Sequence, residues 1–150
     1  VDLDELLKKS DVISLHAPLN EKTYHLINKE NIGKIKKGAI LVNTSRGGLV
    51  DTEALIQALD KGILSGAGLD VLEGEALLKE DRQFAYDDHP KEKLLDVIRT
   101  YNLLERENVV ITPHNAFNSK EAIHRILDTT IENIKCYFKL EPQNVVTENV

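Results

Sequence analysis

The sequence predicts an α/β protein built on a parallel, doubly wound sheet, and three observations support this prediction. Short apolar segments of strand length alternate with segments whose apolar residues recur at helical spacing. Such alternation is typical of a parallel sheet with helices on both faces. The chain has 150 residues, of which 41% are hydrophobic and 29% charged, enough for one domain with a hydrophobic core.

Four strands are expected, each bounded by residues that interrupt regular structure. Pro18 follows the first strand and cannot donate a hydrogen bond to a neighbouring strand, and Gly38 precedes the second. The third strand is small and apolar around Gly66 and Gly68, and the fourth comes much later in the chain. The expected strands are Asp11–His16, Ala39–Asn43, Ile63–Val71 and Asn108–Thr112.

Five helices are expected from apolar spacing and from capping residues. The clearest begins at Asp51 or Thr52 and ends before Gly62. A second has Asn28 as its expected cap, with Ile32 and Ile35 facing inward. The first carries Leu3, Leu6 and Leu7 on one stripe. The expected helices are Asp2–Lys9, Asn28–Lys36, Asp51–Lys61, Lys91–Leu103 and Lys120–Leu140.

Composition excludes several functional classes. A net charge of −6 disfavours a nucleic-acid surface, whose affinity comes from Lys and Arg on phosphates. No apolar run is long enough for a membrane span, and no secretion signal opens the chain. The lone Cys136 fits a reducing, cytoplasmic setting, and no His, Cys and Asp grouping has metal-ligand spacing, so no metal is expected. Because the chain contains no Met, we expect a piece of a longer protein.

Chemistry-bearing residues gather where the expected strands end. In open α/β sheets, ligands bind beyond the carboxyl ends of the strands. Arg46, between small residues, suits capture of a carboxylate with its planar guanidinium group. His114 can both give and take a proton, and Glu75 is available to hold its ring. The groups at the strand ends are His16–Pro18, Asn43–Gly48, Asp70–Glu75 and Thr112–His114.

Other functions for the residues at this edge of the sheet have less support in the sequence. Ser45 does not lie in a Gly-x-Ser-x-Gly motif, so a hydrolase nucleophile is not matched. Gly66 and Gly68 begin a Gly-x-Gly-x-x-Gly spacing, but position 71 is Val, so motifs alone do not indicate dinucleotide binding. His16 lies at the edge and is a possible ligand contact. The remaining histidines, His25, His89 and His124, are interpreted as structural or surface residues.

Four ordered motifs make the chain resemble the D-isomer-specific 2-hydroxyacid dehydrogenase family, from residue 1 to about residue 140. Any one motif is weak, but all four in this order and spacing are highly specific. Within the family the chain looks most like the D-lactate dehydrogenase branch. The motifs are Asp11-Val-Ile-Ser-Leu-His-Ala-Pro-Leu19, Leu41-Val-Asn-Thr-Ser-Arg-Gly-Gly-Leu-Val-Asp51, Gly66-Ala-Gly-Leu-Asp-Val-Leu-Glu-Gly-Glu75 and Ile111-Thr-Pro-His-Asn-Ala116.

The resemblance implies NAD as cofactor, a small 2-oxo or 2-hydroxy acid as substrate, and a Rossmann-like fold. It implies that Arg46 binds the substrate, that His114 is the acid/base and that Glu75 orients His114. Cofactor contacts are implied for Ala17, Pro18, Thr23, Thr44, Ser45, Arg46 and Asp70.

The resemblance also implies an organisation for the chain. Residues 1–117 would form the C-terminal half of an NAD-binding domain, and residues 118–150 a helix and tail that return toward a substrate domain. The isolated piece is expected to be inactive, and the full-length protein to be a cytoplasmic homodimer. Three alternatives stay open: a non-catalytic NAD-sensing module like the corepressors of this fold, another 2-oxo acid reductase, and a Rossmann-like binding domain without a redox role.

Overall fold

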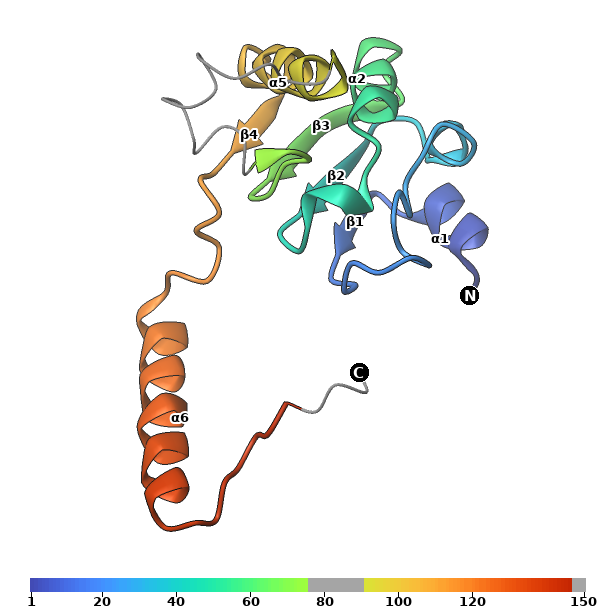
Figure 1. Cartoon of the computed structure of the whole chain (residues 1–150). Coiled ribbons are helices and arrows are strands. Elements are labelled where there is room, and N and C mark those ends of the chain that lie inside the picture. Colours follow the sequence, from blue (N-terminus) through green and yellow to red (C-terminus); the bar gives the residue numbers. More distant parts are fainter. Residues whose placement is uncertain (76–90, 147–150) are drawn as a thin grey trace. The chain divides into compact units, whose positions relative to one another are not determined.

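The computed structural model describes residues 1–75 and 91–146 and divides into two compact units, Val1–His114 and Asn115–Val150. The first unit contains a four-stranded parallel sheet of order β1-β2-β3-β4 (Figure 1). This confirms the predicted parallel α/β fold. The strands are β1 (Val12–Leu15), β2 (Ala39–Asn43), β3 (Leu64–Leu69) and β4 (Val109–Ile111).

Helices connect or flank these strands, and most lie close to their expected positions. The α-helices are α1 (Leu3–Lys9), α2 (Thr52–Asp60), α5 (Lys91–Leu104) and α6 (Lys120–Phe138), and single 3₁₀ turns occur at η1 (Ile32–Lys34) and η2 (Gly47–Leu49). Helix α2 begins where its sequence predicts, because the Asp51 side chain accepts a hydrogen bond from the Ala54 N–H at 3.1 Å. Beyond its last turn, Gly62 adopts a φ of 63°.

The core lies on one face of the sheet. Strand order follows chain order without reversal, so right-handed crossovers carry the connecting helices to the same face. Leu7 of α1, Leu55 of α2 and Leu103 of α5 join buried strand residues in one cluster. Strand side chains directed away from this cluster are exposed: Val12, Ile40 and Val110 are 58, 42 and 66% exposed. Within the described residues of this unit, helices therefore cover one face of the sheet, as in one half of a doubly wound sheet.

Two local predictions were wrong. Residues 28–36 contain only the single turn η1 and no longer helix, because Ile35 is extended (φ −62°, ψ 138°) and the Lys36 N–H donates to the Leu7 carbonyl of α1 at 3.0 Å, not to a carbonyl of its own segment. Asn28 Oδ1 accepts the Glu30 N–H at 2.9 Å, and the Asn31 side chain donates to the Leu26 carbonyl at 2.8 Å. Ile32 and Ile35 are nevertheless buried as expected. Leu6 of α1 is 38% exposed and lies off the buried stripe.

The register of the sheet brings the four strand ends to one edge. Leu15 pairs with Asn43, Asn43 with Leu69, and Leu69 with Ile111. The residues that follow these four positions therefore emerge side by side at the carboxyl edge, where Figure 1 shows the arrowheads ending.

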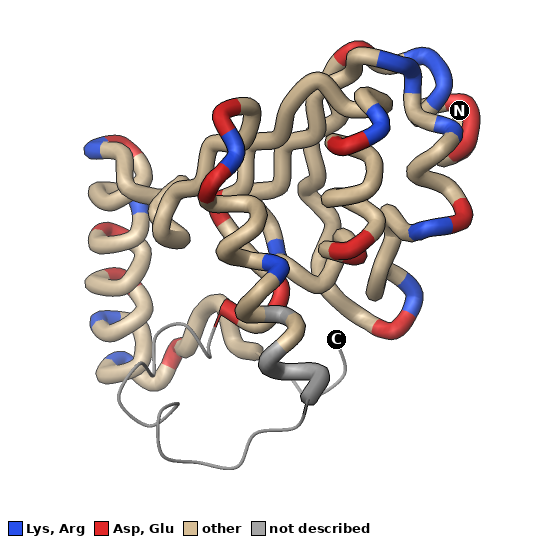
Figure 2. Tube along the Cα trace, turned by 90° about the horizontal axis from the view of Figure 1, so that it is seen from above, with Lys and Arg blue, Asp and Glu red and all other residues tan. Residues whose placement is uncertain are grey.

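The second unit contains α6, an amphipathic helix whose apolar residues are largely exposed. Its Ser119 cap accepts the Ala122 N–H at 3.2 Å, and Cys136 is buried as a free thiol. None of the described helices has the length and apolar character that a membrane span requires. Around the sheet unit, Lys and Arg are interspersed with Asp and Glu along the chain (Figure 2).

Candidate functional site

A pocket of about 680 Å³ opens at the carboxyl ends of β1 and β2. Arg46 lies in its wall on the loop after β2, together with Ser45 and Thr44. The Arg46 guanidinium donates to the Ser45 carbonyl at 2.7 Å and makes no ion pair within the described residues, so most of its donors face solvent. The remaining wall comes from the loop after β1: His16, Ala17, Pro18 and Leu19.

Two hydroxyls that were expected to contact the cofactor hold the loops of this pocket in place. Ser45 Oγ donates to the Leu15 carbonyl at 2.7 Å, which ties the loop after β2 to the end of β1. Thr23 Oγ1 donates to the Pro18 carbonyl at 2.6 Å and accepts the Asn20 N–H at 2.9 Å, which closes the loop after β1. Both residues shape the pocket through the backbone positions that they fix.

Asp70, directly after β3, is buried and joins the loop after β4. The Thr112 hydroxyl donates to Asp70 Oδ1, and the His114 N–H donates to the Asp70 carbonyl at 2.9 Å. A buried carboxylate is costly unless it is hydrogen-bonded, and the Thr112 bond meets this requirement in part. The contacts fix the His114 backbone relative to β3.

His114 and Glu75 form the pair that the sequence predicted. Nδ1 of His114 donates to Oε1 of Glu75 over 2.8 Å, with the side chains 35 and 30% exposed. His114 has a φ of 53°, a left-handed conformation that is uncommon for residues other than glycine. Because Nδ1 is held by the carboxylate, Nε2 remains the nitrogen that can exchange a proton, and it makes no bond within the described residues.

His114 and Glu75 line a second pocket of about 220 Å³, with Asp70 and Thr112 at one side and Leu104 and Ile111 among its apolar residues. Arg46 lines the first pocket and is absent from the second. The structure thus brings Glu75, His114 and Asp70 together, and separately Arg46, Ser45, Thr44, Ala17 and Pro18, along the same sheet edge.

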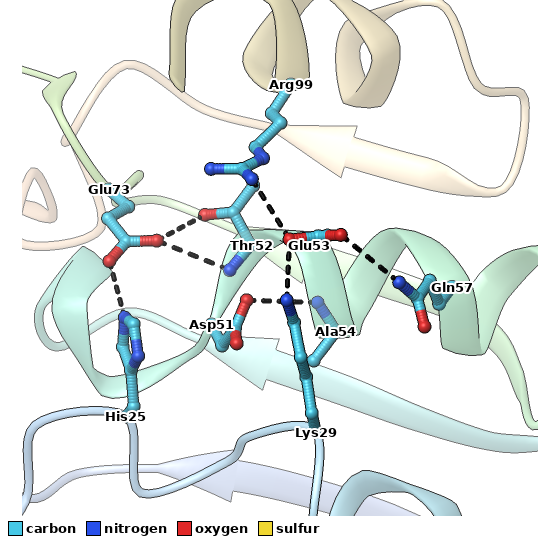
Figure 3. A network of polar contacts seen from close by, with 9 residues as sticks. All are labelled: His25, Lys29, Asp51, Thr52, Glu53, Ala54, Gln57, Glu73 and Arg99. Atoms are coloured by element: carbon cyan, nitrogen blue, oxygen red, sulfur yellow. Dashed lines mark hydrogen bonds and ion pairs between the residues drawn. The ribbon is translucent and has the colours of Figure 1, made fainter. Parts of the chain in front are cut away.

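A second histidine–carboxylate pair was missed from the sequence. Nε2 of His25 lies 2.6 Å from Oε1 of Glu73, two residues before Glu75 (Figure 3). The other Glu73 oxygen accepts the Thr52 hydroxyl at 2.8 Å and the Thr52 N–H at 3.3 Å. His25 had been interpreted as structural or surface, and since 48 residues separate it from Glu73, no local pattern could have revealed the pair.

A neighbouring ion cluster joins the same elements. Glu53 Oε2 lies 2.6 Å from the Lys29 amine and 3.0 Å from the Arg99 guanidinium (Figure 3). The hydrogen bond from Lys29 lowers the pKa of Glu53, and the same bond raises the pKa of Lys29. Among the residues that the structure describes, no group of three or more His, Cys, Asp or Glu is arranged to hold a metal ion.

Comparison with known proteins decides the family. Residues 1–116 match the NAD-binding domain of D-isomer specific 2-hydroxyacid dehydrogenases. The chain belongs to this family. It is 48% identical over 133 residues to a D-specific alpha-keto acid dehydrogenase of Enterococcus faecalis, covering 89% of this chain and 39% of that protein. The chain thus spans about two fifths of such relatives.

Solved structures of family members share the fold at similar identity. D-lactate dehydrogenase from Aquifex aeolicus, complexed with NAD and lactic acid, superposes with a TM-score of 0.78 at 41% identity, over 94% of this chain and 41% of that chain. The pyruvate reductase of Chlamydomonas reinhardtii gives 0.80 at 43% identity, over 97% of this chain and 43% of that one. Both confirm the Rossmann-type fold of the family's NAD-binding domain for the present chain.

The pocket beside Arg46 fits part of a dinucleotide. Its volume of about 680 Å³ lies within the usual range for cofactor sites. Its position beyond the carboxyl ends of parallel strands is where α/β sheets bind nucleotides. The walls offer backbone groups, hydroxyl-bearing residues and one cation, the kinds of partner that sugar and phosphate groups use.

Proposed function

We propose that the full-length protein is an NAD-dependent D-2-hydroxyacid dehydrogenase, and that this chain supplies its acid/base and its carboxylate anchor. The hydrogen bond between His114 and Glu75 at the carboxyl edge of the sheet carries this proposal. This bond leaves the other ring nitrogen, Nε2, free, and it holds the ring next to a carboxylate. A side chain that donates a proton to a carbonyl oxygen requires both features.

Each residue has a distinct role in the proposal. Protonated His114 gives its Nε2 proton to the carbonyl oxygen of a 2-oxo acid and ends as the neutral imidazole. Glu75 holds Nδ1 and so fixes the orientation of the ring. Arg46 binds the substrate carboxylate and polarises the carbonyl, because its guanidinium has donors that no described residue occupies.

The cofactor is held, in this proposal, by the loops at the strand ends. When bound, the reduced cofactor NADH would supply a hydride to the carbonyl carbon of the 2-oxo acid, and NAD⁺ would accept it in the reverse direction. The residues that would hold it are Ala17, Pro18, Thr23, Thr44, Ser45, Arg46 and Asp70.

The substrate we propose is pyruvate, with D-lactate as product. Similarity to the E. faecalis protein and to the D-lactate dehydrogenase from A. aeolicus supports this choice. A D-lactate dehydrogenase at 42% identity supports it as well. Other 2-oxo acids remain the competing substrates, since further relatives are a glyoxylate reductase and a glycerate dehydrogenase, at 41 and 40% identity.

The proposal extends to organisation. Residues 1–117 would form half of the NAD-binding domain, and residues 118–150 would pass toward the substrate domain of a cytoplasmic homodimer. The exposed apolar residues of α6, Ile126, Leu127, Ile131 and Ile134, support packing against a further part of the protein.

Steady-state assays of the full-length protein test the function. NADH oxidation should be saturable with pyruvate, and kcat/KM for pyruvate should exceed that for glyoxylate and hydroxypyruvate. A higher value for either competitor would reassign the substrate within the family. NADH binding without turnover of any of the three would indicate a non-catalytic NAD-sensing module instead.

A further inference from the structure

Glu73 links three segments that are distant in sequence, as Figure 3 shows. One oxygen faces His25 in the loop after β1, and the other accepts both the hydroxyl and the N–H of Thr52 in the first turn of α2. The N–H groups of a first helical turn lack partners within the helix and attract negative charge. With 19% of its side chain exposed, Glu73 is therefore a mostly buried carboxylate with both oxygens satisfied.

The same residue lies inside the turn that carries Glu75. The Glu75 N–H donates to the Leu72 carbonyl at 3.2 Å, and the Leu72 N–H donates back to Glu75 Oε2 at 3.4 Å. Gly74 provides the positive φ of 72° that the turn needs. Since Oε1 of Glu75 receives His114, the position of residues 72–75 determines where the His114 ring is held.

A backbone contact with Gly47 also holds this turn. A Cβ atom on Gly47 would lie 2.2 Å from the carbonyl carbon of Leu72, so the backbone of residue 47 packs directly against the turn. The His25 N–H donates to the Gly48 carbonyl at 2.8 Å. The turn thus packs on the backbone of Gly47 and is tied through the Glu73 side chain to His25 and Thr52.

From these contacts we propose that His25 and Glu73 are positioning residues for the reaction, acting on His114 through the 72–75 turn and Glu75. This inference rests on the proposed function. If the hydrogen bond of Glu73 with His25 or with Thr52 is lost, the Glu73 side chain is held less firmly. Residues 72–75 can then shift together with Glu73. Displacement of a catalytic group by about 1 Å can cost on the order of 100-fold in rate, so a small shift of Glu75 is sufficient.

The neighbouring cluster of Lys29, Glu53 and Arg99 provides a matched control. It connects the loop after β1 with α2, as His25 and Glu73 do, and among the described residues neither Lys29 nor Glu53 forms a hydrogen bond or ion pair with residues 72–75. A substitution there weakens the same two elements without releasing the turn. Glu53→Gln therefore separates positioning of Glu75 from general destabilisation.

The test uses the full-length protein, with kcat and KM for pyruvate and the Kd for NADH. His25→Phe keeps a ring that can stack on Tyr24 but removes the hydrogen bond to Glu73. It should lower kcat about tenfold, which is the order of one charge-assisted hydrogen bond, with KM and Kd within about twofold. His25→Gln retains an N–H near the place of Nε2 and should restore kcat to within about threefold of wild type. Glu53→Gln should leave kcat unchanged.

A double-mutant cycle separates action through Glu75 from an independent effect. In the Glu75→Ala background, His25→Phe should cause no further loss of kcat, because the hydrogen bond through which the turn holds His114 is already removed. Equal losses in both backgrounds, or an equal loss in Glu53→Gln, would overturn the inference. Normal turnover of His114→Gln would refute the proposed function itself, whereas an inactive His114→Gln with a fully active His25→Phe would refute only the positioning role.

Discussion

The two histidine–carboxylate pairs of the sheet unit are similar in geometry but differ in what surrounds them. Both histidines have positive φ angles, 50° for His25 and 53° for His114, and both contact a carboxylate of the turn that follows β3. Glu73, the partner of His25, accepts hydrogen bonds from α2 with its second oxygen. Glu75, the partner of His114, accepts one from its own turn. His25 is thereby anchored within the fold, while His114 presents a free ring nitrogen to a pocket.

The two His–Glu pairs thus differ in what else the carboxylate binds, and in the proposed function this difference decides which histidine transfers a proton. Glu73 connects three segments and serves as a structural tie. Glu75 contacts only its own turn and His114 among the described residues, so its carboxylate is available to stabilise charge on the ring. The predictions below separate these two roles.

Arg46→Lys lies outside both pairs and should cause the largest of these effects. Lysine keeps the charge but loses the planar fork that binds a carboxylate at two points. With charged hydrogen bonds contributing about 1.5–3 kcal/mol each, kcat/KM for pyruvate should fall about 100-fold. NADH affinity, measured by fluorescence titration, should change little. A lysine variant within a few-fold of wild type would mean that Arg46 is not the substrate anchor.

Glu75→Gln tests the reactive pair directly. The amide can still accept a hydrogen bond from His114, but it no longer stabilises the charged ring. We expect kcat for pyruvate reduction to fall about tenfold to 100-fold, the equivalent of one charge-assisted bond. Circular dichroism and NADH binding should match wild type. If kcat is retained, Glu75 has no role in the chemistry.

Gly47→Ala tests whether the turn is held by backbone packing. The new Cβ would overlap the Leu72 backbone, and overpacking of this kind costs about 1–3 kcal/mol. The free energy of unfolding should fall by that amount in urea titrations, and kcat should fall with it. Gly33→Ala is the matched control, since a Cβ there meets nothing within 4 Å. Similar stability of the two variants would contradict the close contact.

Glu53 should give the smallest effect, visible as a pH dependence of stability. The Lys29 hydrogen bond lowers the pKa of Glu53 below its ordinary value of 4.5. The ionised carboxylate therefore adds stability above that value, and the contribution is lost as pH falls through the lowered pKa. Because the groups are exposed, the effect is small. The thermal midpoints of wild type and Glu53→Gln should converge as pH decreases, and a constant difference at all pH values would contradict the ion pair.

Local sequence patterns predicted most of the fold because the relevant physics is local. The apolar run Ala39–Asn43, following Gly38, became β2 at the expected bounds, and the Asp51 cap fixed the start of α2. Residues 28–36 were misassigned because the extended conformation of Ile35 and the hydrogen bond from the Lys36 N–H to the Leu7 carbonyl depend on tertiary packing, which helical spacing does not reveal. Whether helices cover one face of the sheet or both depends on the strand order. The spacing of the elements along the sequence does not reveal that order.

The predicted site residues divide in the same way. His114 and Glu75 were found because both follow strands whose ends meet at one edge. His25 was missed because it lies in the long segment between β1 and β2, away from the strand ends. Only tertiary packing brings it to Glu73. Ser45 and Thr23 are predicted to contact the cofactor, and the sequence could not show that their hydroxyls also donate to backbone carbonyls, because those bonds depend on the loop conformations.

The most direct measurement compares His114→Gln with His25→Gln in the full-length protein, as kcat for pyruvate at saturating NADH. Both substitutions remove one imidazole that contacts a turn carboxylate. Loss of a general acid/base costs at least about 100-fold, so His114→Gln should lose that much, whereas His25→Gln, which keeps its donor to Glu73, should stay within about threefold of wild type. Equal losses in the two variants, or the larger loss at His25, would contradict the assignment of His114 as the acid/base.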